Sequence, residues 1–142
     1  MLARIQSCAI LGIDSIPVAV EVDASPGMQA KVIIVGLPDT AVKESSERVL
    51  AAVKNSGFRT PRGHTVVNLA PADIRKEGSA LDLPIALGMI AATDQLRSTM
   101  LAEYSISGEL ALNGSVRPVA GALSMAIGAR RAGLKGIVLP AE

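Results

Sequence analysis

Two side chains near the middle of the chain could carry out covalent chemistry together. Lys76 and Ser79 lie in one charged loop, on either side of Gly78. A serine hydroxyl becomes a nucleophile when a neighbouring amine accepts its proton, as in Ser-Lys enzymes. A serine just before an apolar helix also has a simpler use, because its oxygen can accept a hydrogen bond from a free amide at the helix start. Adjacent loop residues rarely have the geometry for proton transfer, so we expect Ser79 to cap the helix.

The acidic and imidazole side chains do not have the spacing of a metal site. Asp73, Glu77 and Asp82 would make a poor magnesium site without further carboxylates, and helix-terminus electrostatics accounts for acidic residues at such positions. His64 is the only histidine and has no histidine or cysteine partner at ligand spacing. We therefore expect no metal and no cofactor in this chain.

Four basic residues flank one predicted strand at residues 65–69. Arg59 and Arg62 precede this strand, whereas Arg75 and Lys76 follow it. A straight strand would hold the two pairs about 20 Å apart. Solvated loop ends are the simplest interpretation of either pair alone. Phosphate binding needs only spaced cations, however, so these four residues are candidates for contact with a DNA backbone.

The overall composition suits a single α/β domain. The chain has 142 residues, of which 49% are apolar, while its only aromatic residues are Phe58 and Tyr104. Its core must therefore consist of aliphatic side chains, as in sheets covered by helices. The net charge of +1 neither requires nor excludes nucleic acid. No segment approaches the roughly 20 uninterrupted apolar residues of a membrane helix, so we expect a cytoplasmic protein without membrane contact.

The periodicity of apolar residues predicts the elements that position these groups. Residues 3–11 and 16–24 read as an antiparallel pair, and the continuous apolar run 31–36 predicts a strand covered on both faces. A helix is expected to begin at Asp39 as its N-cap and to end at Gly57. The remaining predictions are helices at about 80–95 and 121–132, and strands at 65–69, 104–107, 109–112, 116–118 and 137–139, with a type I′ turn at Asn113-Gly114.

These elements together predict the fold class. Alternating and fully apolar strands, interleaved with three capped helices, indicate an α/β domain with a mixed sheet. We expect two helices to pack against this sheet and a third to lie nearby. An all-helical structure or a parallel doubly wound sheet would contradict this interpretation.

Two blocks of sequence resemble the Lon-type protease domain. They are Arg75-Lys-Glu-Gly-Ser-Ala-Leu-Asp-Leu-Pro-Ile-Ala-Leu87 and Ser107-Gly-Glu-Leu-Ala-Leu-Asn-Gly-Ser-Val-Arg-Pro-Val-Ala-Gly-Ala-Leu123. Proteolytic Lon domains read K-D-G-P-S-A-G in the first block and G-E-V-x-x-x-G-x-V-x-P-I-G-G-L-K in the second. Laid over this chain without gaps, their catalytic serine falls on Ala80 and their catalytic lysine on Leu123. The resemblance therefore implies a domain without catalytic residues.

The lost dyad leads to two structural expectations. We expect Ala80 and Leu123 to have been repacked as apolar core. Ser79 takes the place of the proline before the nucleophile, and one residue along a helix turns a side chain by about 100°. Ser79 should therefore point away from the former catalytic pocket.

Two further motifs are Val35-Gly-Leu-Pro38 and Glu44-Ser-Ser-Glu-Arg-Val49. Together with the block that begins at Arg75, they resemble the N-terminal domain of the ComM/YifB family of magnesium-chelatase-like AAA+ ATPases. The resemblance implies a Lon-protease-like, ribosomal-protein-type two-layer α/β fold over residues 1–142. It also implies a longer protein with an AAA+ domain downstream, a hexameric ring, and ATP and Mg²⁺ as cofactors of that full-length protein. The implied role is DNA branch migration during natural transformation, with this domain serving ring assembly and DNA contact.

Two other functions remain open at this point. One is a Lon-type peptidase that uses Ser79 with Lys76 as its base. The other is a magnesium chelatase subunit in tetrapyrrole metallation, although the chain offers no evident porphyrin or metal site. The motif G-x-x-x-x-G-K-[ST] is absent, so this chain cannot bind a nucleotide through a Walker loop.

Overall fold

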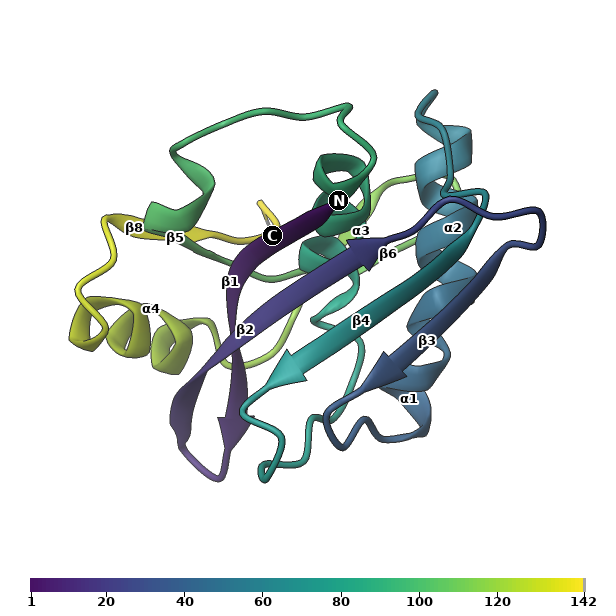
Figure 1. The fold of residues 1–142 in the computed structure, drawn as a ribbon. Helices are drawn as coiled ribbons and strands as arrows, with labels where there is room; N and C mark the ends of the chain where they lie inside the picture. Colours follow the sequence, from purple (N-terminus) through teal and green to yellow (C-terminus); the bar gives the residue numbers. More distant parts are fainter. Residues whose placement is uncertain (142) are drawn as a thin grey trace.

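A four-stranded mixed sheet forms the centre of the domain (Figure 1). The computed structural model describes residues 1–141. The strand order is β1-β2-β4-β3, with β1 antiparallel to β2, β2 antiparallel to β4, and β4 parallel to β3. The strands are β1 (Leu2–Leu11), β2 (Asp14–Ala24), β3 (Lys31–Val35) and β4 (His64–Ala70). Both the predicted antiparallel pair and the predicted mixed sheet are confirmed.

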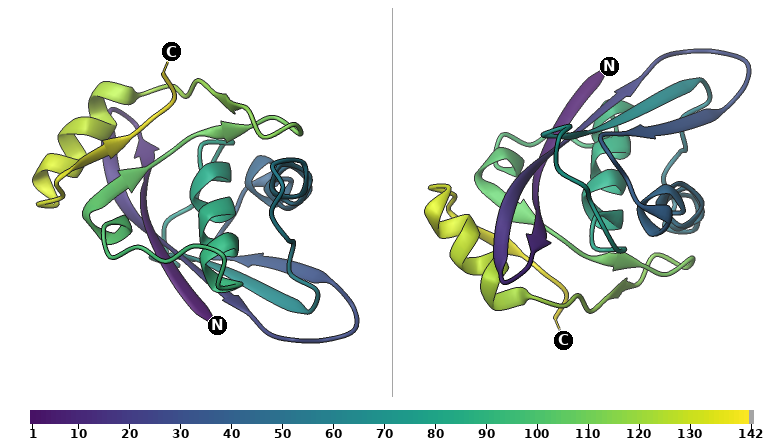
Figure 2. Two further views of the ribbon diagram at one scale, coloured as in Figure 1. Left: turned by 90° about the horizontal axis from the view of Figure 1, so that it is seen from above. Right: turned by 90° about the horizontal axis from the view of Figure 1, so that it is seen from below.

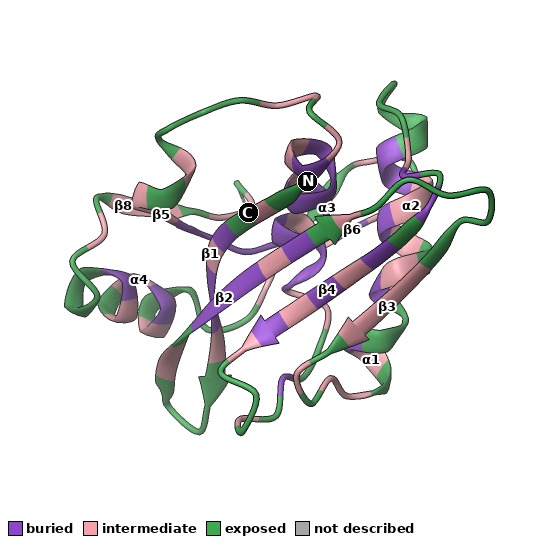
Figure 3. Cartoon of the chain, viewed as in Figure 1, coloured by how far each residue is buried: buried purple, intermediate pink, exposed green. Residues whose placement is uncertain are grey.

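The alternation of side chains gives this sheet one buried face and one open face (Figure 3). Val20 and Val22 of β2 are fully buried, and Val20 lies opposite the equally buried Leu69 of β4. The side chains between them point the other way, where Asn68 Nδ2 donates to Glu21 Oε1 at 2.8 Å. The sequence pattern of β2 therefore identified the two faces correctly.

Two helices cover the buried face. α2 (Ser45–Asn55) and α3 (Asp82–Ala92) lie behind the sheet in Figure 1, and the views in Figure 2 place them on the same side of it. Gly88 permits a close approach of α3, because a Cβ atom there would lie 2.5 Å from Cγ2 of Val22. None of the helices within residues 1–141 is long and apolar enough to cross a membrane.

The end of the molecule that lies away from β3 in Figure 2 is formed by residues 101–106 and by the last part of the chain. The last helix, α4 (Ala122–Arg131), packs on the β1–β2 hairpin, where a Cβ atom at Gly128 would lie 2.9 Å from Cβ of Ser15. The chain also forms two small sheets, a parallel one that contacts α4 and β1 and an antiparallel one that lies beside α2 and α3. These elements are the 3₁₀ helix η1 (Leu101–Glu103), β5 (Tyr104–Ile106) with β8 (Gly136–Val138), and β6 (Glu109–Leu110) with β7 (Val116–Arg117).

The prediction that β3 is covered on both faces is wrong. β3 pairs only with β4 and is therefore an edge strand. Its side chains are exposed or half-buried, and Val35 retains 41% of its surface. The apolar run was misleading because only the side chains facing the helices are shielded, while the alternate ones lie on the open face of the sheet.

The helix predicted from Asp39 is present but divided. Asp39 caps α1 (Thr40–Lys43) as expected, with Oδ1 accepting from Val42 N at 2.8 Å. The chain then tightens at Glu44, whose carbonyl accepts from Glu47 N at 3.1 Å in a 3₁₀-type turn, and α2 follows as a separate helix.

The hairpin predicted at Asn113-Gly114 forms between β6 and β7, but not with a type I′ turn. That turn needs positive φ at both central residues. Of the two, only Gly114 has a positive φ, at 92°. Because the loop between the two short strands is longer than two residues, a second residue with positive φ is not needed.

Candidate functional site

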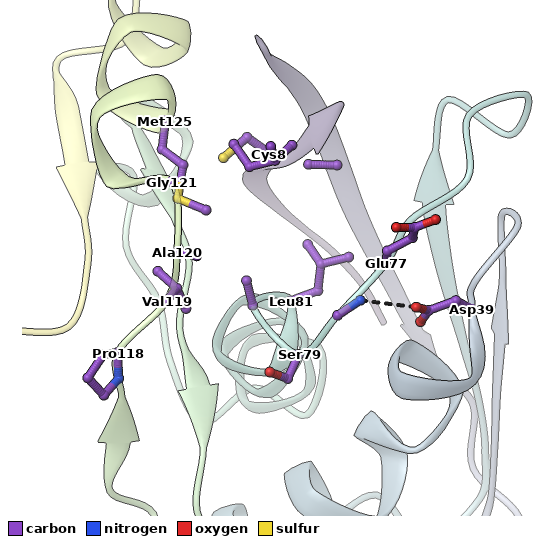
Figure 4. Close-up of a pocket in the computed structure, with 14 residues that line it drawn as sticks. Cys8, Asp39, Glu77, Ser79, Leu81, Pro118, Val119, Ala120, Gly121 and Met125 are labelled. Carbon is purple, nitrogen blue, oxygen red and sulfur yellow. Dashed lines mark hydrogen bonds between the residues drawn. The ribbon is translucent and has the colours of Figure 1, made fainter. Parts of the chain in front are cut away.

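A cavity of about 580 Å³ lies at the position expected for a Lon-type catalytic site (Figure 4). Its walls come from β1, from the loop before α3 and from the extended segment before α4. Gly78, Ser79 and Ala80 lie together on one wall, and Asp39 closes it with an Oδ2 atom 3.2 Å from Gly78 N. Within the described chain, no lysine, arginine or histidine lines this cavity.

Ser79 is one of the residues that line the cavity (Figure 4), but Glu109, the partner of its hydroxyl, is not. The expectation that Ser79 caps α3 is wrong, because that helix begins after Leu81 and has no side-chain cap. The Ser79 hydroxyl instead donates to Oε1 of Glu109 at 2.5 Å. The loop sequence could not reveal this hydrogen bond, because Glu109 belongs to a strand that is distant in the chain.

The two positions of the lost dyad are not equivalent in the structure. Ala80 is half-buried beside Ser79 and lines the cavity. Leu123 lies on the first turn of α4, retains 75% of its surface and is not part of the cavity wall. The expectation that Leu123 is repacked as core is therefore wrong, since this turn of α4 faces solvent. Met125, one half-turn later, is buried and reaches the cavity.

Lys76 is not available to Ser79 or to DNA. Its side chain is fully buried, and Nζ donates to the carbonyl oxygens of Gly36, at 2.8 Å, and Pro71. Burial lowers the pKa of Lys76, against a weaker opposing effect of Asp73. The prediction of a DNA contact by Lys76 is corrected accordingly, because an amine enclosed by main-chain carbonyls cannot reach a phosphate.

The other predicted cations are exposed, and the structure separates them as expected. Arg75 lies after β4, and its Nε atom is 3.7 Å from the carboxylate of Glu77, with both side chains largely exposed. Arg59 and Arg62 lie before β4 and line a second cavity of about 630 Å³. Within residues 1–141, no carboxylate lies within 4.0 Å of either arginine's side-chain nitrogens.

This second cavity also contains groups that the sequence analysis did not assign to a site. Lys54, in the last turn of α2, and Phe58 line it together with the two arginines. Gln95 fixes the main chain of Arg59 through two hydrogen bonds, one to the amide and one to the carbonyl, both 2.8 Å long. The signal that could have revealed the site was the density of cations around an aromatic residue within residues 54–62.

Comparisons with known proteins identify the family. A family model described as subunit ChlI of magnesium chelatase matches residues 20–142. YifB of Escherichia coli strain K12 is 46% identical over 137 residues, which are 96% of this chain and 27% of YifB. The chain belongs to the magnesium-chelatase-like AAA+ family. The competence protein ComM of Haemophilus influenzae is 42% identical over 130 residues, or 92% of this chain and 25% of ComM.

The Lon resemblance is also found at lower similarity. Lon protease 2 of Thermus thermophilus is 26% identical over 128 residues, covering 85% of this chain and 16% of the protease. The chain spans about a quarter of the length of YifB and ComM. The resemblance to the ComM/YifB family, predicted from the sequence motifs, is confirmed by these relatives.

In this magnesium-chelatase-like domain, the motifs that carry the family resemblance have structural roles. Asp82 is fully buried and accepts hydrogen bonds from Ser45 Oγ at 2.5 Å, from Leu110 N at 3.1 Å and from Arg48. Arg48 contributes Nε at 2.7 Å and Nη2 at 3.0 Å. The hydrogen bond to Asp82 holds the pKa of Arg48 above its ordinary value, and Glu109 adds a smaller electrostatic effect. One buried ion pair thus joins α2, α3 and β6.

The Val35-Gly-Leu-Pro38 motif of the family also has a structural role, since it holds the loop before α3 in place. Gly36 has φ = 106°, and a Cβ atom there would lie 2.2 Å from the carbonyl oxygen of Leu69. Main-chain hydrogen bonds then join this segment to the loop before α3, from Lys76 N to Leu37 O and from Asp39 N to Lys76 O. These contacts set the position of the loop that carries Ser79 and Ala80.

Proposed function

We propose that this chain is a non-catalytic domain of a bacterial AAA+ ATPase that acts on DNA. In this proposal the domain contacts the DNA backbone through Arg59 and Arg62 and also helps to assemble the ring of the full-length protein. ATP and Mg²⁺ would bind to the motor domain downstream. The process would be branch migration or recombination in natural transformation, in keeping with the name of the competence protein ComM. A cytoplasmic location agrees with this role.

The unpaired cations of the second cavity carry the DNA part of this proposal. Arg59, Arg62 and Lys54 all line this cavity, and no carboxylate neutralises them within the described chain. Spaced cations of this kind bind phosphates without regard to sequence. Arg75 belongs to the proposal with a smaller contribution, because Glu77 offsets its charge.

The lack of a catalytic pair supports the non-catalytic part. A Ser-Lys dyad needs an amine within roughly 3 Å of the hydroxyl. The Ser79 hydroxyl donates to Glu109 instead, and the Lys76 amine is enclosed by the carbonyls of Gly36 and Pro71. Ala80, at the position that the resemblance assigns to the nucleophile, offers only a methyl group.

An exposed apolar surface supports the role in ring assembly. Leu123 and Ile127 lie one turn apart on α4 and retain 75% and 44% of their surfaces. Ile13, at the tip of the β1–β2 hairpin, is 88% exposed, and its carbonyl accepts from Ser124 Oγ at 2.9 Å, which holds the tip beside α4. Apolar side chains gathered in this way mark contact surfaces, and a second copy of the chain is the occupant that a ring requires.

Charge reversal with a matched control tests the DNA contact. In the full-length protein, the Arg59→Glu/Arg62→Glu variant should bind DNA of any sequence more weakly. Its affinity should also depend less steeply on salt concentration than that of the unaltered protein. Each phosphate contact contributes about 0.7–0.9 to the slope of log affinity against log salt. Arg4→Glu/Lys43→Glu changes the charge by the same amount at two exposed positions, on β1 and in the last turn of α1, away from both the cavity and the α4 surface. Equal binding curves for the two variants would refute the proposed contact.

The peptidase remains the second candidate because Ser79 does line a cavity. Casein turnover by the full-length protein with ATP, compared with a Ser79→Ala variant, distinguishes it. We expect no cleavage by either protein, and cleavage that disappears on substitution would establish a peptidase. The chelatase reading has less support, since no three His, Cys, Asp or Glu side chains within residues 1–141 gather as a metal site would require.

A further inference from the structure

The second cavity combines cations with an exposed aromatic ring. Lys54, Phe58, Arg59 and Arg62 all line it, and Phe58 retains 41% of its surface. Phe58 is the only phenylalanine in a chain that is 1% aromatic. The segment that carries it, after α2, is exposed in Figure 3. An aromatic face beside unpaired cations is the combination that binds single-stranded nucleic acid, where bases stack and phosphates pair.

Helix capping does not account for these cations. Lys54 suits the C-terminal end of α2, where cations are favoured by the helix dipole. The last carbonyls of this helix are already occupied, however, by the amides of Ser56, Gly57 and Phe58. Arg59 and Arg62 lie beyond the helix and have no structural partner for their side-chain nitrogens among the described hydrogen bonds and ion pairs.

The nearest acidic residue in the adjoining loop does not neutralise the cavity. Asp94 follows α3 and pairs with Arg97 through two hydrogen bonds of 2.8 Å each. These hydrogen bonds hold the pKa of Asp94 below its ordinary value, so this pair stays ionised and contributes no net charge. The positive charge of Lys54 and the two arginines is therefore left for an anionic ligand.

The main chain of the cavity is held in place before any ligand arrives. Gln95 bonds the amide and the carbonyl of Arg59, and its Nε2 also donates to Thr93 Oγ1 at 2.8 Å. Pro61, between the two arginines, is buried and restricts the backbone further. A cavity of about 630 Å³ lies in the size range of small-molecule and cofactor sites, roughly 300–1,000 Å³.

We propose that this cavity binds a nucleotide of single-stranded DNA, with its base stacked on Phe58 and its phosphates on Lys54, Arg59 and Arg62. The inference rests on the DNA contact proposed above and adds a preference for single strands. In a duplex, the bases are already stacked on one another and cannot reach the ring. Phosphates remain accessible in both forms, so the arginines serve either DNA and Phe58 serves only the single strand.

Strands with and without bases test the role of Phe58 in the full-length protein. Binding of oligothymidylate, an abasic strand of equal length and a duplex would be measured by fluorescence anisotropy. Phe58→Ala should weaken binding of oligothymidylate about 5- to 140-fold, the range equivalent to a stacking contribution of about 1–3 kcal/mol per base. It should leave binding of the abasic strand and the duplex unchanged. Phe58→Trp keeps a stacking face and should bind oligothymidylate at least as tightly as the unaltered protein.

The outcomes separate this inference from the DNA contact on which it rests. Base stacking on Phe58 is refuted if Phe58→Ala binds oligothymidylate as tightly as the unaltered protein does. It is also refuted if the substitution weakens binding of the abasic strand as much as binding of oligothymidylate. If thymidine monophosphate displaces the strand at concentrations near the protein's own, the cavity is a site for free nucleotides and the strand proposal falls. If Arg59→Glu/Arg62→Glu leaves binding of all three DNA ligands unchanged, the proposed DNA contact fails with it.

Discussion

The buried ion pair between Arg48 and Asp82 gives a stability prediction that can be worked out from the structure. Asp82 has no exposed surface and accepts four hydrogen bonds, two of them from Arg48. Arg48 retains 22% of its side-chain surface and also donates to the carbonyl of Ala41 at 2.9 Å. Removal of one member of such a pair leaves the other as a buried charge without a partner.

The two single substitutions should therefore be costly, and to different degrees. Removing one partner of a buried pair typically costs about 3–5 kcal/mol. Arg48→Met leaves the carboxylate of Asp82 enclosed with only two neutral donors, so we expect a loss in this range. Asp82→Asn keeps the shape and an acceptor while Arg48 can turn to solvent, so we expect about 2 kcal/mol.

The double variant measures how strongly the two side chains depend on each other. We expect Arg48→Met/Asp82→Asn to be less destabilised than the sum of the single variants by about 2 kcal/mol, within the range seen for contacting residues. Urea unfolding gives these differences when the dependence on urea is the same in all four proteins. The raised pKa of Arg48 keeps it charged from neutral to moderately alkaline pH, so the coupling should not change there.

A matched cycle on the exposed pair Asp94 and Arg97 provides the control. Their two hydrogen bonds are as short as those of the buried pair, but both side chains face solvent. We expect a much smaller coupling there, and one that salt reduces further. Additive losses at Arg48 and Asp82, or equal coupling in the two cycles, would show that burial does not give this ion pair its strength.

Three further predictions follow from local geometry. Gly36→Ala should lower the free energy of unfolding in urea by at least about 3 kcal/mol, because a Cβ atom would lie 2.2 Å from Leu69 O. As a control, Gly133→Ala, which is also at positive φ but in open space, should lower it by about 1–2 kcal/mol. As pH rises toward the ordinary lysine pKa, the folded protein releases the Lys76 proton before the unfolded chain does, so the free energy of unfolding should increase with pH in that window. A Lys76→Met variant that keeps the same increase with pH would show that Lys76 does not cause it. Under the proposed ring assembly, Leu123→Glu should shift the full-length protein to smaller species in light scattering, and an unchanged mass would remove α4 from the proposed assembly surface.

Most of the fold could be predicted from the sequence because local periodicity determines it. The alternation of Val20 and Val22 with Glu21 reflects a sheet with one covered face, and the structure has that face. Asp39 was identified as a helix cap from its position alone, because capping depends on neighbours within one turn.

The errors concern residues whose environment is set by distant parts of the chain. Lys76 reads as a solvated cation in a charged loop, but the carbonyls of Gly36 and Pro71 enclose it. Ser79 reads as a helix cap, but its hydroxyl donates a hydrogen bond to Glu109 of β6. Leu123 reads as core by analogy with a repacked site, but its turn of α4 is uncovered. Tertiary contacts of this kind leave no periodic signal in a single sequence.

The candidate DNA site was predicted in part for the same reason. Arg59 and Arg62 stood out as cations flanking a strand, and in the structure both line the second cavity. Lys54 and Phe58 were not assigned to a site, although both lie in the same short segment as the two arginines. Gln95 could not be connected with Arg59 at all, because the two lie 36 positions apart in the chain.

The location of bound DNA tests the central claim most directly. Full-length protein would be irradiated with single-stranded DNA that carries a photoreactive thymidine, and the crosslinked peptides would be identified by mass spectrometry. The proposed site predicts crosslinks within residues 58–62, which are lost in the Arg59→Glu/Arg62→Glu variant and retained in Arg4→Glu/Lys43→Glu. Efficient crosslinking elsewhere in the protein, with none in residues 58–62, would contradict the claim that this domain contacts DNA through this cavity.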